Sequence, residues 1–145
     1  AVTIPAQKSH QRKKFVAPKL GSGGFSWPVE GEIITEFGPS GRGVHNDGVN
    51  FAASVGAPVI VSANGTVAFV GDNIKNFGKL ILVKHDGGII TAYAHLNSIS
   101  VNEGEELTAG DIIGNVGSTG RVARPQLHFE IRKSRQPIDP RSLIS

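Results

Sequence analysis

Residues 126–132 carry the side chains of this 145-residue sequence that are best suited to chemistry. Polar and apolar residues alternate along this segment with a period of two, which is typical of a half-buried β-strand. The polar positions are Gln126, His128, Glu130 and Arg132, and the apolar positions are Leu127, Phe129 and Ile131. A strand that presents a histidine and a glutamate on one face could hold a metal ion or position a proton donor. A pair of histidines would indicate a metal site more strongly, and here glutamine occupies the position two residues before His128.

A second histidine lies in a similar strand pattern. Residues 89–96 alternate so that Thr91, Tyr93 and His95 are predicted to share one face. If this strand lies beside residues 126–132, His95 and His128 meet across one groove. A lone histidine on a strand is equally compatible with a structural, hydrogen-bonded role, so the pattern by itself leaves both interpretations open.

The segments that must position these residues are short and numerous. Alternating or apolar runs predict further strands at residues 32–37, 49–53, 58–63, 66–70, 79–85, 89–96 and 111–116. The turn sequence Asp86-Gly87-Gly88 lies between two of these runs, which predicts a β-hairpin. No long window shows a helical stripe, and residues 140–144 form one helical turn at most. We therefore expect an all-β domain, a compact antiparallel β-sandwich or partly open barrel.

Composition and charge limit the remaining possibilities. The length predicts one domain, and no apolar run is long enough to span a bilayer. The absence of cysteine excludes disulfides and thiolate metal sites. Residues 1–25 carry five basic and no acidic side chains, whereas residues 26–145 carry ten basic and twelve acidic ones, which argues against nucleic-acid binding by the folded part. Residues 1–24 are predicted to be a flexible basic linker, and residues 25–145 the folded domain.

Seven segments together resemble the LytM (lysostaphin-type) peptidase domain. They are residues 27–29 (WPV), 48–53 (GVNFAA), 57–59 (APV), 65–67 (GTV), 93–96 (YAHL), 117–120 (GSTG) and 126–132 (QLHFEIR). The resemblance runs from about Phe25 to the C-terminus and implies the fold of that family, with long loops that form a groove. It also implies kinship with zinc endopeptidases that cut the peptide cross-links of bacterial peptidoglycan.

Active members of the family share the pattern His-x-Gly-x-Asp, then Tyr-x-His, then His-x-His, and this sequence departs from it at three of the five functional positions. The first histidine and the aspartate, both zinc ligands in that family, correspond to Asn46 and Asn50. The first histidine of the last pair corresponds to Gln126, so only His95 and His128 match. Neutral amides are weak zinc ligands, and glutamine cannot transfer a proton in the working pH range. We therefore predict no bound zinc and no catalytic residue, and we call these five residues the relict positions.

Two residues beside the first relict position offer an alternative metal site. His45 precedes Asn46 and Asp47 follows it, so a bulged loop would bring His45, Asp47 and His128 together as rescue ligands. Such a bulge must turn side chains that a regular strand points to the opposite face. The site would also need a replacement for Gln126. An active zinc-dependent peptidoglycan endopeptidase with a rearranged site is therefore kept as an alternative function.

The altered positions resemble a branch of the family, the murein hydrolase activators of the NlpD, EnvC and DipM kind, and especially the DipM-like proteins of alphaproteobacteria. These proteins act in cell division in the periplasm or cell envelope of Gram-negative bacteria, often behind LysM domains. The resemblance implies a non-catalytic regulator of peptidoglycan remodelling that binds and activates N-acetylmuramyl-L-alanine amidases or related murein hydrolases. Its partner-binding groove is then expected to consist of Asn46, Asn50, His95, Gln126, His128 and Arg132.

Two other functions are compatible with parts of the sequence. The groove could bind peptidoglycan directly, without a partner enzyme. Residues 101–114 resemble the hammerhead segments of biotinyl and lipoyl carriers, but no lysine lies at a suitable hairpin tip and methionine is absent. Because LytM domains use the same turn segment, the carrier interpretation carries little weight.

Overall fold

The structure is a computed structural model that describes residues 20–21, 23–39, 41 and 43–144. Nearly all regular elements in this part of the chain are strands, as the alternating pattern predicted. They are β1 (Glu32–Thr35), β2 (Gly38–Pro39), β3 (His45–Asn46), β4 (Val49–Ala52), β5 (Pro58–Ile60), β6 (Gly65–Ile74), β7 (Gly78–His85), β8 (Ile89–Ile99), β9 (Glu106–Leu107), β10 (Ile112–Val116), β11 (Gln126–Lys133) and β12 (Gln136–Ile138), followed by the one-turn helix α2 (Arg141–Ile144). Within the described ranges, no helix has the length and apolar character needed to cross a membrane.

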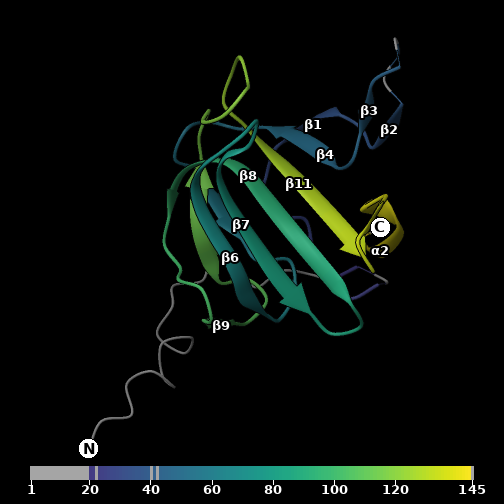
Figure 1. Cartoon of the computed structure of the whole chain (residues 1–145), viewed down its shortest axis with the longest axis vertical. Coiled ribbons are helices and arrows are strands. Elements are labelled where there is room, and N and C mark those ends of the chain that lie inside the picture. The colour runs from purple at the N-terminus through teal and green to yellow at the C-terminus, as the bar shows by residue number, and fades with distance from the viewer. Residues whose placement is uncertain (1–19, 22, 40, 42, 145) are drawn as a thin grey trace, which may run out of the picture.

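Ten of the described strands form one antiparallel sheet (Figure 1). Its main path runs β1-β4-β11-β8-β7-β6-β9, and β12 pairs with β11 as a hairpin. β10 pairs both with the C-terminal part of β8 and with β5. β2 and β3 form a separate two-stranded ladder before β4. The path of paired strands does not close into a barrel in the described residues, so the expected all-β antiparallel fold is confirmed in its open form.

The main hydrophobic core lies on one face of this sheet. Leu127, Phe129 and Ile131 of β11 are fully buried in it, which confirms the predicted alternation of residues 126–132. Trp27 packs against Phe51 of β4 with 5.5 Å between the ring centroids, so the segment before β1 also contacts the sheet. The polar side chains of β11 consequently lie on the opposite face.

The hairpin between β7 and β8 forms as predicted. His85 pairs with Ile89 across the turn. Gly87 and Gly88 have positive φ angles of 81° and 76°, which glycine adopts without steric cost.

The predicted face of His95 is wrong, because β8 contains an irregularity. Thr91 and Tyr93 are fully buried on the core side, and Leu96 also returns to the core. Between them, His95 has a positive φ of 67°, and the pairing of β8 with both β7 and β10 shifts register in this region. His95 therefore lies on the same side of the sheet as His128. A strict period of two cannot anticipate a bulged residue.

Strand limits differ from the prediction by a few residues. β6 and β8 are longer than the predicted segments 66–70 and 89–96, whereas β1 and β5 end at Thr35 and Ile60. The strands β2, β3, β9 and β12 were not predicted, because two or three residues are too few to show periodicity.

Candidate functional site

The relict positions come together where β4, β11 and β8 run side by side (Figure 1). Cross-strand pairing places His128 of β11 between Asn50 of β4 and Ala94 of β8. The turn before β4 lies directly on β11, because Gly48 has no side chain: an added Cβ would lie 2.2 Å from the carbonyl oxygen of Phe129. This close approach brings β4 and the residues before it into reach of the polar face of β11.

Three of the relict positions are amides joined in a hydrogen-bonded chain. The Nδ2 group of Asn46 donates to the backbone carbonyl of Glu36 at 3.2 Å and to Oδ1 of Asn50 at 3.1 Å. Asn50 in turn donates through Nδ2 to Oε1 of Gln126 at 2.7 Å. The Nε2 group of Gln126 reaches the backbone carbonyl of Arg124 at 3.4 Å. Because backbone carbonyls only accept hydrogen bonds, the two ends of the chain determine the orientation of all three amides.

His128 lies between this amide chain and a carboxylate. Its Nδ1 is 2.9 Å from Oδ1 of Asn50, and its Nε2 is 2.8 Å from Oε2 of Glu130. Burial by itself raises the pKa of Glu130, but the hydrogen bond and charge of His128, together with those of Arg132, lower it below its ordinary value. An ionised Glu130 and the oxygen of Asn50 are both acceptors, so both hydrogen bonds form when the two ring nitrogens of His128 each carry a proton.

The carboxylate of Glu130 continues the polar chain toward the loop before β4. Arg132 donates through Nε to Oε1 of Glu130 at 2.8 Å and approaches Oδ2 of Asp47 at 3.5 Å. Asp47 also contacts Nδ1 of His45 at 3.2 Å. The structure thus joins His45 to Asp47, but Asp47 faces Arg132 and not His128. No group of three or more His, Cys, Asp or Glu side chains in the described residues is arranged to hold a metal ion.

His95 meets His128 across the same groove, as the adjacency of their strands predicted. The ring centroids are 6.2 Å apart. Nδ1 of His95 donates to the backbone carbonyl of Thr119 at 2.8 Å, so the neutral ring keeps its lone pair at Nε2. Burial, and then the charge of His128, lower the pKa of His95, although the hydrogen bond to Thr119 opposes them. The structure therefore groups all five relict positions and Arg132 on one side of the sheet.

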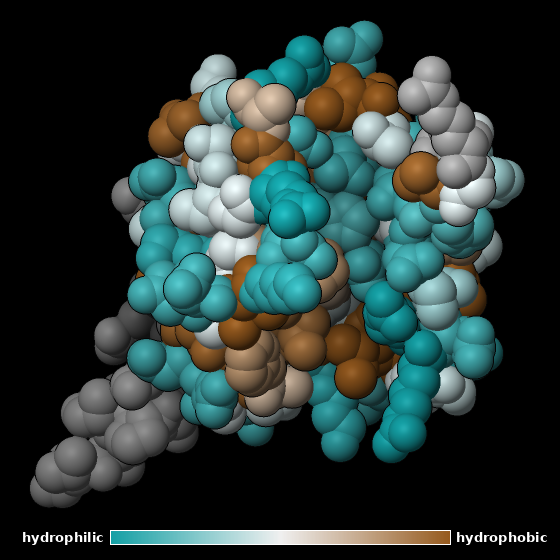
Figure 2. Space-filling model, turned by 45° about the horizontal axis from the view of Figure 1, so that its top comes forward, coloured by the Kyte–Doolittle hydropathy of each residue, from teal (hydrophilic) through white to brown (hydrophobic). Residues whose placement is uncertain are grey.

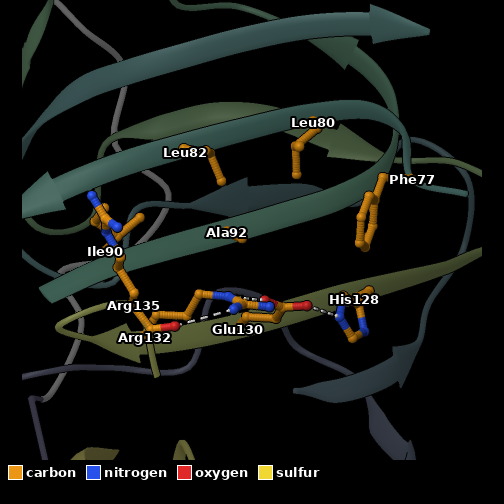
Figure 3. Close-up of a pocket in the computed structure, with 9 residues that line it drawn as sticks. All are labelled: Phe77, Leu80, Leu82, Ile90, Ala92, His128, Glu130, Arg132 and Arg135. Atoms are coloured by element: carbon orange, nitrogen blue, oxygen red, sulfur yellow. Dashed lines mark hydrogen bonds and ion pairs between the residues drawn. The ribbon is translucent and has the colours of Figure 1, made fainter. Parts of the chain in front are cut away.

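Next to this polar cluster lies a cavity of about 340 Å³, which we call the apolar cavity (Figure 3). Its lining residues are Phe77, Leu80, Leu82, Ile90, Ala92, His128, Glu130, Arg132 and Arg135. In Figure 3 the aliphatic side chains of β7 and the residues of β8 face the row formed by His128, Glu130 and Arg132. Figure 2 shows hydrophobic residues gathered in a recess of this side of the molecule, between borders that are mostly hydrophilic.

The apolar members of this cavity were not among the residues predicted to form a site. Apolar residues on a strand indicate core packing, and alternate residues of β7 and β8 do enter the main core. Leu80, Ala92 and Ala94 instead form a second, smaller cluster on the opposite face, against which Phe77 and Leu82 pack. The signal was present in residues 80–83, because four consecutive apolar residues place apolar side chains on both faces of a strand, more than one buried face requires.

Residues 44–140 match the model of Peptidase family M23, and the chain belongs to this family. This confirms the LytM resemblance on which the relict positions were assigned.

The similar proteins of known name include activators of murein hydrolases. The chain is 46% identical to the cell division protein DipM of Caulobacter vibrioides, over 83% of the chain and 21% of that protein. It is 40% identical to the murein hydrolase activator NlpD of Escherichia coli, over 80% of the chain and 30% of that protein. The chain therefore spans about a fifth to a third of these relatives.

The similar solved structures include peptidases, one of which is named as zinc-containing. A zinc-containing peptidase from Vibrio cholerae superimposes with a TM-score of 0.74 at 32% identity, over 80% of this chain and 39% of that one. The peptidase lysostaphin from Staphylococcus simulans gives a TM-score of 0.74 at 26% identity, over 84% and 53% of the two chains. One fold is thus shared by relatives named as activators and by structures named as enzymes.

Proposed function

We propose that this chain is a non-catalytic regulator of peptidoglycan remodelling, which binds and activates a cell-wall amidase or related murein hydrolase during cell division in the envelope of a Gram-negative bacterium. The observation that carries the proposal is the closed hydrogen-bond chain through Asn46, Asn50 and Gln126 at the positions where active LytM enzymes hold zinc and its catalytic histidine. The printed names of DipM, a cell division protein, and NlpD, a murein hydrolase activator, support the same function.

The donor set at the relict metal positions does not fit zinc. A catalytic zinc site takes three protein ligands, which are mostly imidazole, thiolate or carboxylate. Here the oxygen of Asn50 already accepts from both Asn46 and His128, and both nitrogens of His128 face acceptors. A metal ion would have to break these hydrogen bonds in exchange for neutral amide oxygens. We therefore propose that the domain has no zinc and no metal-dependent step.

The same positions leave no obvious route for proton transfer. Gln126 does not titrate, so it cannot replace a histidine that assists a nucleophilic water. Both carboxylate oxygens of Glu130 accept hydrogen bonds, one from His128 and one from Arg132. The carboxylate is therefore not free to transfer a proton to or from a substrate. The polar face of β11 and its neighbours instead presents a set of polar groups that are hydrogen-bonded to one another. We propose that Asn46, Asn50, His95, Gln126, His128 and Arg132 form a surface that a partner enzyme recognises.

The proposal is tested by mixing the 145-residue chain with dye-labelled sacculi, with and without a purified N-acetylmuramyl-L-alanine amidase. We expect dye release by the amidase to increase when the chain is added, and no release by the chain alone. Release by the chain alone would indicate an active endopeptidase. Sedimentation of the chain with sacculi, without any stimulation of the amidase, would indicate a peptidoglycan-binding domain; either result contradicts the proposal.

Charge reversal of Arg132 tests whether the groove is the recognition surface. Arg132 shares the polar face of β11 with Gln126 and His128, and its side chain is 36% exposed. An Arg132→Glu variant should weaken both amidase binding and stimulation. Lys133→Glu, the same reversal at an exposed residue of β11 whose position alternates with those of the polar face, serves as the control. Unchanged stimulation by a folded Arg132→Glu variant would remove the main support for this surface.

A further inference from the structure

The apolar cavity beside His128, Glu130 and Arg132 has features that the relict positions do not explain. Its volume of about 340 Å³ lies within the range of about 300–1,000 Å³ that is usual for ligand pockets. Phe77, Leu82 and Ile90 are only partly buried, and they line the cavity without filling it. An apolar surface that is recessed and half-exposed favours the insertion of an apolar group from another molecule.

The polar side of the cavity is already neutralised internally. Glu130 is 4% exposed and is bonded to both His128 and Arg132. Its carboxylate therefore neither attracts a basic ligand strongly nor leaves a buried charge without a partner. Figure 3 shows these three residues as one row along the cavity. Selectivity for charge has to come from another residue.

That residue is Arg135, at the open end of the cavity next to Ile90 (Figure 3). Among the described residues, the ion pairs on this side join His45, Asp47, Arg132, Glu130 and His128, and none of them includes Arg135. Arg135 lies in the turn between β11 and β12 with a positive φ of 73°, a conformation that an L-residue with a side chain adopts at a cost and that glycine adopts freely. Its carbonyl accepts a hydrogen bond from Arg132 at 3.4 Å, which ties the turn to the cavity.

From these features we infer that the apolar cavity takes a large aliphatic or aromatic side chain of the partner hydrolase, and that a carboxylate adjacent to this side chain pairs with Arg135. This inference rests on the proposed function, since it assumes a protein partner. The positive charge of Arg135 favours an acidic segment of the partner. The volume and apolar lining of the cavity favour a bulky side chain over a methyl group.

Other occupants fit these features less well. Residues 1–19 of this chain carry five basic side chains and no acid, so their charge is the same as that of Arg135. The peptides of peptidoglycan carry carboxylates, but their apolar groups are mainly alanine methyls, which leave most of the cavity unfilled. In a second copy of the chain, the large hydrophobic residues exposed in the described part are Leu20, Val44 and Val55, and none of them is adjacent in sequence to an acidic residue that could pair with Arg135. Each of these occupants is an outcome of the test below.

The chemistry of the cavity is tested by titrating the isotope-labelled chain with N-acetyl-L-phenylalanine and with its uncharged amide, observed by NMR. We expect saturable shifts at Phe77, Leu80, Leu82, Ala92 and Arg135, with the acid bound about two- to fivefold more tightly than the amide, as for an exposed ion pair. An Arg135→Gly variant relaxes the turn while removing the guanidinium. It should lose the preference for the acid and keep the affinity for the amide.

The competing occupants give different results in the same experiment. No shift in the cavity, or equal affinity of the wild-type chain for acid and amide, would overturn the inference. Tighter binding of soluble peptidoglycan peptides at the same residues would assign the cavity to the wall. Shifts that depend on the concentration of the chain alone would assign it to a second copy. Both of these assignments also overturn the inference.

Amidase stimulation separates the failure of this inference from the failure of the proposed function. Ala92→Leu is designed to fill the cavity from its floor, and its folding is checked by thermal unfolding. If the wild-type chain stimulates the amidase and a folded Ala92→Leu variant does so equally, the inference fails while the function stands. If the wild-type chain does not stimulate the amidase, the proposed function fails. The inference then fails as well, because it assumes a hydrolase partner, even if the probe titration shows binding in the cavity.

Discussion

His128 matches the last histidine of the LytM pattern, but its hydrogen bonds differ from those expected of a metal ligand. Both of its ring nitrogens face acceptors, Asn50 on one side and Glu130 on the other. A metal ligand must present an unprotonated nitrogen, so this hydrogen-bond pattern opposes metal binding even though the residue type matches. The neighbouring amides set this pattern, because Asn50 can only present its oxygen to His128 while its NH2 group donates to Gln126.

Restoring the family residues should therefore restore a metal site. A variant with Asn46→His, Asn50→Asp and Gln126→His replaces three amides by one carboxylate and two imidazoles that lie beside His128. We expect it to retain about one zinc ion per chain after dialysis, measured by elemental analysis, because a catalytic zinc site needs three such ligands. The wild-type chain should retain almost none. Stoichiometric zinc in the wild-type chain would contradict the proposed function.

His85 provides a second residue-scale test, far from the relict positions. Its Nδ1 donates to the carbonyl of Asn64 at 2.7 Å, and its Nε2 is 2.8 Å from the hydroxyl of Thr91. Tyr93 contacts the same hydroxyl at 2.7 Å, so the network is satisfied when Tyr93 donates to Thr91 and Thr91 donates to a neutral His85. Burial lowers the pKa of His85 below its ordinary value of 6.5, although its hydrogen bond to Asn64 opposes this.

The lowered pKa of His85 predicts a loss of stability in mild acid. Between its folded pKa and 6.5, the unfolded chain binds a proton that the folded chain does not, so the free energy of unfolding decreases as the pH falls through this window. Urea unfolding at pH 7.5 and 5.5 should show a smaller pH effect for His85→Gln than for the wild-type chain. The lowered pKa of His95 acts in the same direction in both proteins, whereas the lowered pKa of Glu130 affects stability only at lower pH. An equal pH effect in the two proteins would argue against a neutral His85.

At the scale of the elements, three irregular backbone features assemble the candidate site. The bulge at His95 turns that ring to the face of His128. The positive φ at Arg135 places its side chain at the end of the apolar cavity. The absence of a side chain at Gly48 lets β4 lie against β11. Regular strands alone would not bring these groups together.

Gly48→Ala should disturb the site through the backbone. Its Cβ would meet the carbonyl oxygen of Phe129 at 2.2 Å and Cγ of Glu130 at 2.8 Å, so β4 must move away from β11. We expect a loss of about 1–3 kcal/mol in the free energy of unfolding, as for other overpacked sites. Gly56→Ala is the comparison, because it has a positive φ of 94° but nothing within 4 Å, and should cost about 1–2 kcal/mol from backbone strain alone.

NMR distinguishes the two glycine variants qualitatively. Gly48→Ala should shift the resonances of Asn50 and His128, whose side chains are hydrogen-bonded across the β4–β11 pair. Gly56→Ala should leave these resonances unchanged. If Gly48→Ala leaves both stability and these resonances intact, the close approach of the two strands does not hold the site together.

At the scale of the whole molecule, the sheet separates two kinds of apolar packing. One face carries the main core, which includes fully buried residues of β11, β8 and β5. The other face carries the polar row of β11 and the small cluster around Leu80 and Ala92. The first face stabilises the fold, and this leaves the second face available for recognition.

Residues 1–19 should be dispensable for the fold. They belong to the predicted linker and lie outside the described residues. The buried core begins at Phe25, and the family match at residue 44. A chain that starts at Leu20 should have the same Tm as the whole chain, measured by circular dichroism. Removal of residues 20–24 as well should lower the Tm, because Gly23 donates to the carbonyl of Leu143 and Gly21 to that of Phe25. A large loss on removing residues 1–19 alone would contradict the predicted linker, whose last residues Gly21 and Gly23 are hydrogen-bonded to the folded part.

The sequence by itself determined the parts of this protein that depend on local pattern. Alternation predicted β11 and its two faces, and Asp86-Gly87-Gly88 predicted the hairpin between β7 and β8. The spacing of seven segments identified the family, and on that basis predicted that Asn46, Asn50 and Gln126 occupy altered site positions. These features can be read from the sequence alone, because strand periodicity, turn chemistry and motif spacing are properties of residues that are close together in the chain.

Only the tertiary structure decided what those residues do to one another. The bulge at His95 overrode the period of two, and the pairing of Asp47 with Arg132 placed it away from His128. The apolar cavity arose because residues of β7 and β8 that resemble core residues in the sequence lie on the face that the main core does not cover. Hydrogen bonds, burial and cavities depend on which strands become neighbours, and that is set by packing over the whole chain.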